Sequence, residues 1–197
     1  MAGHDKLNAL LGPRLSRLRG SEAAALIEFA VSLPLLVVLV IGIFDFGGAF
    51  NLKQELNNAA REGAIFGASQ PTNDLLIATG TPPSVDAVRY LVAAYLQGAG
   101  MNPCGLNTMS APTSQSGPMT WIYATTGTCV AGLTLTIQRP CIGPGCPSFL
   151  GAYVPYTSVT ISYPYQWHFN NVIQLLVPGA NFTLTNITTN ATAANMN

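Results

Sequence analysis

An apolar stretch near the N-terminus constrains the fold of this 197-residue chain more than any other feature. Residues 23–44 read AAALIEFAVSLPLLVVLVIGIF, and Glu28 is the only charged side chain among them. A helix of this length covers about 30 Å, which is the thickness of the hydrocarbon core of a bilayer. In lipid, a single segment satisfies all its backbone polar groups only as a helix. The sequence therefore predicts one transmembrane helix over residues 23–44.

Charged residues are distributed unevenly on the two sides of this stretch. After Tyr90, Arg139 is the only Asp, Glu, Lys or Arg side chain. Before the stretch, the chain carries four basic residues, Lys6, Arg14, Arg17 and Arg19. Basic residues directly before an apolar span favour a cytoplasmic N-terminus. We therefore predict that residues 1–22 form a cytoplasmic leader and that the C-terminal part is exported.

The exported sequence does not contain the patterns of common enzymes or nucleic-acid-binding proteins. Clustered Lys and Arg, which phosphate backbones require, do not follow the span. His4 and His168 lie on opposite sides of the span, so together they form neither a catalytic triad nor a metal site. The exported acids and glycines suggest neither a glycosidase pair nor a phosphate-binding loop. We predict no enzymatic activity, cofactor, metal, nucleic acid or small-molecule substrate.

All four cysteines follow the span, at Cys104, Cys129, Cys141 and Cys146. Four cysteines permit three pairings. The Gly-Pro-Gly within CIGPGC lets a short loop close, which favours Cys141–Cys146 and leaves Cys104–Cys129. The rival interpretation is a four-thiolate zinc site. Irregular spacing, the absence of a neighbouring histidine and an exported location favour disulfides.

From Asp45 to Ser69 the pattern becomes that of an amphipathic helix. Apolar and small residues recur at spacings of three and four, namely Ala49, Leu52, Leu56, Ala59, Gly63 and Phe66. Gln70-Pro71 ends the pattern, because proline disfavours helix in the residue before it. We expect one helix from about Ala24 to Ser69, with Pro34 producing a kink that membrane helices tolerate.

Ala59, Gly63 and Gly67 form a row of small residues at four-residue spacing within this helix. Such a row allows close approach to a neighbouring helix. It also allows the helix to lie close to a sheet of its own domain. The row lies beyond the predicted span, which favours the second interpretation.

The remaining sequence predicts an α+β domain with a small antiparallel sheet. A second helix is expected over Ser84–Gln97, with Ser84 as its N-cap and Asp86 in its first turn. Alternation of apolar and polar residues predicts strands, which we place at Leu133–Gln138, Ser158–Tyr163, Phe182–Ile187 and Met119–Thr125. Helices followed by strands are typical of α+β folds.

These elements divide the exported part into a domain over residues 45–187 and a flexible polar tail over residues 188–197. Between two of the strands, residues 170–179 read NNVIQLLVPG. Their apolar run is too short to span a membrane, so we expect it to join the core or to contact the membrane surface.

Glu28 is unusual because a carboxylate within a bilayer costs about 2.5–3.5 kcal/mol at its centre, and less near an end of the span. The ordinary explanation is an acid near a helix end that reaches the interface. The alternative is a cationic partner. An N-terminal amine created by a cut before Ala24 would provide one, since residues 24 and 28 lie on one helix face, and a neighbouring subunit would be another source.

A series of short motifs runs along the long helix. They are Ile27-Glu28-Phe29-Ala30, Pro34, Asp45-Phe46-Gly47 and Asn58 to Ala64. In these motifs residues 25–68 resemble the TadE-like pseudopilins of Flp (Tad) pilus systems, and the later SVTISYPYQW is loosely similar to the family's closing strand.

This resemblance implies a precursor cut by a prepilin peptidase, an aspartyl enzyme of the membrane. With Glu28 as the fifth mature residue, the cut falls between Ala23 and Ala24. The family usually has glycine before the cut, and a cut between Gly20 and Ser21 would restore it, with Glu28 eighth. The implied location is the bacterial inner membrane, and the implied partners are lipid, the peptidase and other pseudopilins or pilus assembly proteins.

We predict a bitopic pseudopilin- or minor-pilin-like protein that acts structurally in Flp/Tad pilus assembly and surface adhesion. Glu28, Phe29 and Pro34 are the expected intramembrane pairing residues. The alternative is a secreted or surface-anchored, adhesin-like binding domain behind a cleaved signal peptide. The apolar run is longer than a typical signal core, and Gly47-Gly48-Ala49 is the nearest candidate cleavage site.

Overall fold

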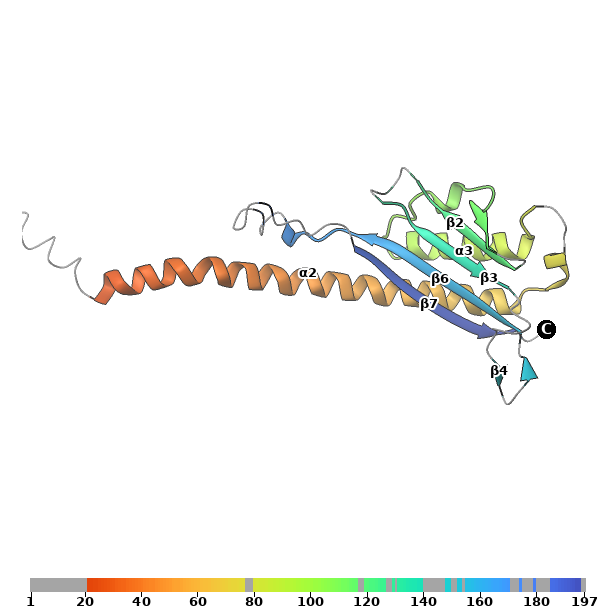
Figure 1. Cartoon of the computed structure of the whole chain (residues 1–197), viewed down its shortest axis with the longest axis horizontal. Helices are drawn as coiled ribbons and strands as arrows, with labels where there is room; N and C mark the ends of the chain where they lie inside the picture. Colours follow the sequence, from red (N-terminus) through yellow and green to blue (C-terminus); the bar gives the residue numbers. More distant parts are fainter. Residues whose placement is uncertain are drawn as a thin grey trace, which may run out of the picture. The chain divides into compact units, whose positions relative to one another are not determined.

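The computed structural model describes residues 21–76, 80–116, 119–126, 129, 131–139, 148–149, 152–153, 155–170, 174, 179 and 185–195. The chain divides into two compact units. One consists of Met1–Phe46 and His168–Ala180, and the other of Gly47–Trp167 and Asn181–Asn197. The helix α2 (Ser21–Ser69), which Figure 1 shows as the long helix, contributes residues to both units.

The predicted continuous helix is confirmed by α2, which contains Pro34 in its interior. The helix ends one residue before Gln70, whose N–H donates to the carbonyl of Gly67. Pro71 follows directly and disfavours helical geometry at Gln70. The short 3-10 helix η2 (Asn73–Leu76) then leads toward the second helix.

The second helix, α3 (Pro83–Gly98), covers the predicted range, but its start differs from the prediction. Ser84 is not the N-cap, because the helix begins at Pro83 and Ser84 is its second residue. The Ser84 N–H donates to Asp74 Oδ2 at 2.8 Å, so a carboxylate from η2 provides the acceptor that a capping side chain would supply. Pro83 suits the first helical position, since it has no N–H to satisfy.

The predicted antiparallel sheet has five strands. In chain order they are β1 (Ser114–Gln115), β2 (Thr120–Ala124), β3 (Thr134–Gln138), β6 (Tyr156–Tyr165) and β7 (Thr185–Ala194). They lie in the order β1-β2-β3-β6-β7 (Figure 1). A second, two-stranded sheet pairs β4 (Ser148–Phe149) with β5 (Ala152–Tyr153), and a 3-10 helix, η3 (Leu106–Thr108), follows α3. The α+β fold class is confirmed.

The register of β3 and β6 separates an apolar face from a polar one. Leu135 pairs with Ile161 and Ile137 pairs with Val159, and all four side chains are buried. The alternate residues of these strands are mostly Thr and Ser, and they face the other side. The buried face joins α3 and the α2 residues from Leu56 onward in one hydrophobic core.

The prediction of a flexible tail over residues 188–197 is wrong for Thr188–Ala194. These residues belong to β7, which pairs with β6 along its whole length, from Tyr156–Ala194 to Tyr165–Thr185. The predicted strand over Phe182–Ile187 shares Thr185–Ile187 with β7, and residues 182–184 lie outside the described residues. The extension escaped recognition because the inward-facing residues after Ile187 are small or polar, namely Thr189, Ala191 and Ala193. Thr189 donates a hydrogen bond to Asn57 of α2.

The row of small residues in α2 packs inside the domain, as the favoured interpretation predicted. A Cβ at Gly63 would lie 2.8 Å from Val92 Cγ2, and one at Gly67 would lie 2.8 Å from Thr157 Cγ2. Ala59 is fully buried. The row therefore lets α2 approach α3 and β6 at a distance that larger side chains would not permit.

The last charged residue of the sequence, Arg139, is fully buried at the end of β3. Its Nε donates to Thr157 Oγ1 at 3.1 Å and its Nη2 donates to the carbonyl of Gln70 at 3.0 Å. Burial lowers the pKa of Arg139, and the negative charge of Asp74 partly offsets this effect. Arg139 thus ties the C-terminal end of α2 to the sheet.

Candidate assembly site

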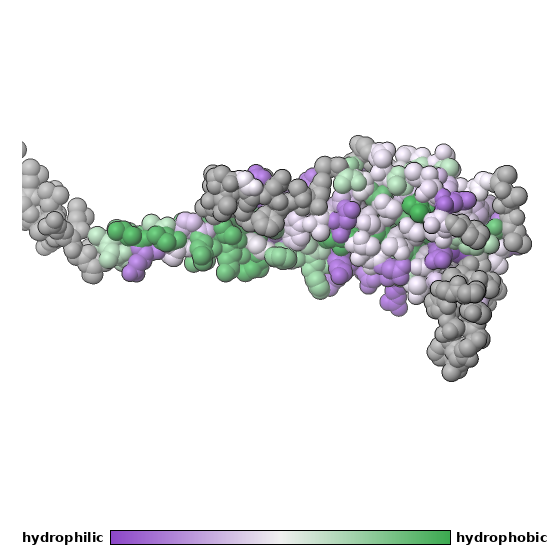
Figure 2. Space-filling model, viewed as in Figure 1, coloured by the Kyte–Doolittle hydropathy of each residue, from purple (hydrophilic) through white to green (hydrophobic). Residues whose placement is uncertain are grey.

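The N-terminal part of α2 carries an apolar surface that the rest of the described chain does not cover. The helix is long and apolar enough over Ala23–Ser69 to cross a membrane, and its most apolar window is entirely unburied. Large apolar side chains are exposed along it from Leu26 to Phe44, and Figure 2 shows them as a hydrophobic band. An apolar surface of this kind marks a contact with lipid or protein.

Glu28 lies within this surface and is exposed. Among the described residues, no ion pair or hydrogen bond involves its carboxylate. The neighbouring predicted residues, Phe29 and Pro34, also lie on α2, where Phe29 is 61% exposed. All three residues are thus on the part of the helix that is available to a partner.

The predicted cleavage positions lie at the beginning of α2. Ser21 is its first residue, and Ala23 and Ala24 follow in the first turn. Gly20 and the basic leader lie outside the described residues. The first helical turn has unsatisfied N–H groups and frays readily, so a cut there interrupts the least stable part of the helix.

Asp45 is a buried acid whose structural role is not evident from the sequence pattern. Its side chain is only 3% exposed. Asp45 Oδ2 accepts the backbone N–H of Phe169 at 2.7 Å, and Oδ1 lies 3.0 Å from His168 Nδ1. The ring of Phe46 stacks on that of Phe169 at 6.5 Å between centroids. We call these four residues the Asp45 clasp. Its only signal in the sequence was the Asp45-Phe46-Gly47 motif.

A comparison with known families matches a large part of α2. The family model described as TadE-like protein matches residues 23–64, about a fifth of the chain. Residues 23–64 form a TadE-like segment. No curated protein and no solved structure matches the chain.

The TadE-like segment begins at the candidate cleavage position Ala23 and includes Glu28, the apolar surface and Asp45. It ends at Ala64, in the part of α2 that packs in the hydrophobic core. The family resemblance inferred from short motifs is thereby confirmed. The matched family is a family of pilus components and not of enzymes.

The last motif of the TadE-like segment, Asn58 to Ala64, has two faces. Its small residues are buried in the hydrophobic core, and they are Ala59, Ala60, Gly63 and Ala64. The side chains of Asn58, Arg61 and Glu62 are exposed. The described residues contain no ion-pair partner for Arg61 or Glu62. One face therefore holds the helix against its own domain, and the other presents a cation and an anion to the surroundings.

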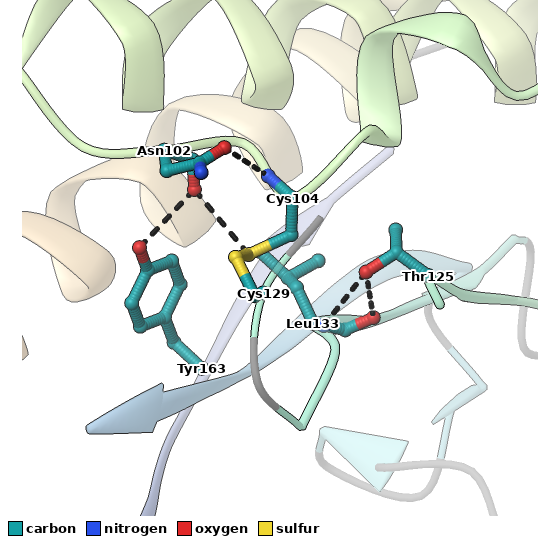
Figure 3. The surroundings of a disulfide bond; sticks show 6 residues. All are labelled: Asn102, Cys104, Thr125, Cys129, Leu133 and Tyr163. Carbon is teal, nitrogen blue, oxygen red and sulfur yellow. Dashed lines mark hydrogen bonds between the residues drawn. A yellow bond between two sulfur atoms is a disulfide. The ribbon is translucent and has the colours of Figure 1, made fainter. Parts of the chain in front are cut away.

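Two of the four cysteines form the predicted Cys104–Cys129 disulfide, with Cα atoms 5.2 Å apart. Figure 3 shows Asn102 beside it, where Asn102 Oδ1 accepts the Cys104 N–H at 2.9 Å. The carbonyl of Asn102 accepts the Tyr163 hydroxyl from β6 at 3.1 Å. Cys141 and Cys146 lie outside the described residues. Among the described residues, no group of three potential metal-binding side chains occurs.

Proposed function

We propose that this chain is a single-pass membrane protein that acts structurally in the assembly of a Tad-type pilus. In this proposal α2 spans the inner membrane of a bacterium over residues 23–44, with the basic leader in the cytoplasm and the α+β domain exported. The exported domain would meet other pilus components or the surface to which the cell adheres.

One observation carries this proposal. The unburied apolar part of α2 and the exported part of α2 are one helix, and the TadE-like segment covers the junction between them. A signal peptide is removed, so continuous packing of its helix into the mature domain would serve no purpose. An anchored assembly subunit uses both halves, because the first half holds the protein in the membrane and the second positions its domain.

Glu28 supplies the most direct functional test. We expect Glu28→Ala to reduce pilus formation about tenfold or more. The cation that pairs with Glu28 in the assembly would be left unpaired in lipid, which is strongly destabilising. Membrane insertion should be unchanged, since the substitution makes the span more apolar. Pili would be counted by electron microscopy, and insertion would be measured by resistance to carbonate extraction.

Glu28→Asp is the matched control because it keeps the charge, and we expect partial recovery of pilus formation. Leu36→Ala, on the same exposed surface, changes bulk but not charge. Normal pilus formation in Glu28→Ala would contradict intramembrane pairing by Glu28.

The secreted binding domain is the second candidate, because an N-terminal apolar helix is also typical of a signal sequence. Intact mass of the protein recovered from cells separates the two. We expect a membrane-bound product that lacks the residues before Ala24 or before Ser21, as a prepilin peptidase would produce. A soluble product that begins near residue 50 would instead support the secreted domain and overturn the anchor.

A further inference from the structure

We infer that the chain contacts the bilayer surface at a second place besides α2, through the segment His168–Asn170 that Asp45 holds beside the helix. The inference rests on the proposed membrane span. It assigns a lipid-contacting role to a segment more than a hundred residues away in sequence, and it explains why an acid directly after the span is buried.

Asp45 lies where a helix spanning the membrane emerges from it. It is about 25 Å further along α2 than Glu28, and the intervening residues are uncharged. An acid at this level would ordinarily be solvated. Both Asp45 oxygens instead have protein partners, the Phe169 N–H and the His168 ring. A carboxylate satisfied by the protein can lie against a poorly hydrated surface without the cost of an unpaired polar group.

Aromatic residues flank Asp45 on α2 and follow its partner His168. Phe44 and Phe46 are 76% and 64% exposed on α2, and Phe46 stacks on Phe169. The side chain of His168 is 82% exposed. Aromatic rings collect at the boundary between headgroups and acyl chains, where an apolar body and a polar edge are both accommodated. The Asp45 clasp thus combines rings suited to acyl chains with a polar, exposed imidazole.

Lipid is the occupant that the composition of this surface favours. The surface at the Asp45 clasp is continuous along α2 with the apolar surface of the proposed span. The chain from His168 to Gly179 contains no Asp, Glu, Lys or Arg, so His168 is the one side chain there that could carry charge for recognition of a protein partner. A crosslink to protein instead of lipid is the opposite outcome of the photocrosslinking experiment.

The test places a photoreactive benzoylphenylalanine at position 169 of the full-length protein. The protein is reconstituted into vesicles of phosphatidylethanolamine and phosphatidylglycerol and irradiated, and captured lipid is detected as a mass increase. We expect capture at position 169 and at position 46. The same probe at Leu36 of the span is the positive control. The probe at Ile65, an exposed residue of α2 about 30 Å beyond Asp45, should capture no lipid.

Asp45→Ala should reduce capture at position 169 about tenfold and leave capture at position 46 unchanged, because two hydrogen bonds to a carboxylate are lost. His168→Ala should cause a smaller loss, since the Phe169 N–H bond remains. The Cys104–Cys129 disulfide, assayed by mass, reports whether each variant folds. If Asp45→Ala does not fold, Asp45→Asn replaces it, and capture at position 169 should again fall.

Lipid capture at position 36 without capture at position 169 would overturn the inference and leave the membrane span intact. A crosslink from position 169 to protein instead of lipid would overturn it as well, as would capture at 169 that survives loss of the Asp45 carboxylate. Absence of capture at position 36 would contradict the proposed span itself.

Discussion

Replacing both Cys104 and Cys129 by alanine is expected to lower the free energy of unfolding by about 3 kcal/mol. The bond closes a loop with a sequence separation of 25, and it connects the segment after α3 to the segment between β2 and β3. Without it, the unfolded chain gains the conformational entropy of an open loop. Urea unfolding of the full-length protein in detergent micelles, followed by circular dichroism, measures the change.

The folded state also depends on this bond locally. Cys104 is 1% exposed and has a φ of 54°, a left-handed conformation that is unfavourable for a residue with a side chain. Asn102 contributes by accepting hydrogen bonds from the Cys104 N–H and the Tyr163 hydroxyl. Loss of the disulfide therefore removes one of the contacts that hold this left-handed turn.

Cys141→Ala with Cys146→Ala is the comparison. If these cysteines form the predicted pair, their removal opens a much shorter loop and should cost about 1–1.5 kcal/mol less than removal of Cys104–Cys129. Equal stability of the Cys104/Cys129 variant and the parent protein would contradict the expected role of that disulfide.

Gly67→Ala is expected to destabilise the α+β domain by about 1–3 kcal/mol, although alanine is the better helix former. The new Cβ would lie 2.8 Å from Thr157 Cγ2 and 3.1 Å from Val88 Cγ2. Thr157 cannot rotate away without cost, because its hydroxyl accepts from Arg139 Nε and donates to Asn195 Oδ1. The side chain is β-branched and stiff as well. The clash is therefore transmitted to the buried Arg139.

Gly47→Ala is the matched control on the same helix, since a Cβ there meets nothing within 4 Å. This substitution should stabilise the protein by up to about 1 kcal/mol through helix propensity alone. Opposite signs for the two variants in chemical unfolding would establish close packing at Gly67. A stabilising effect of Gly67→Ala would contradict the packing of α2 on β6.

Much of the fold follows from local patterns in the sequence. The apolar run and the three- and four-residue spacing after it predict α2, because both require the same helical period. Alternation in Leu133–Gln138 and Ser158–Tyr163 predicts β3 and β6, since one face of each strand is buried and the other is polar. The TadE-like motifs are equally local, and all of them lie on one helix.

The candidate site is only partly visible in these patterns. Glu28 stands out by its charge within an apolar run, so the sequence suffices to select it. Asp45 has no such contrast, because an acid after a span is ordinary. Only its contacts with His168 and Phe169 reveal its role, and those residues follow more than a hundred positions later.

The sequence by itself determined the apolar helix, its continuation as an amphipathic helix and the α+β class, because the hydrophobic period and the residues that end helices and strands are local properties. Tertiary structure alone decided that Asp74 supplies the acceptor at the start of α3, that β7 extends through the polar C-terminal residues, and that Arg139 is buried. Each of these depends on a partner outside the element itself, from Asp74, ten residues before Ser84, to Gln70, which lies 69 residues before Arg139. The free energy of satisfying a buried polar group depends on which group the fold brings to it, and no local pattern records that choice.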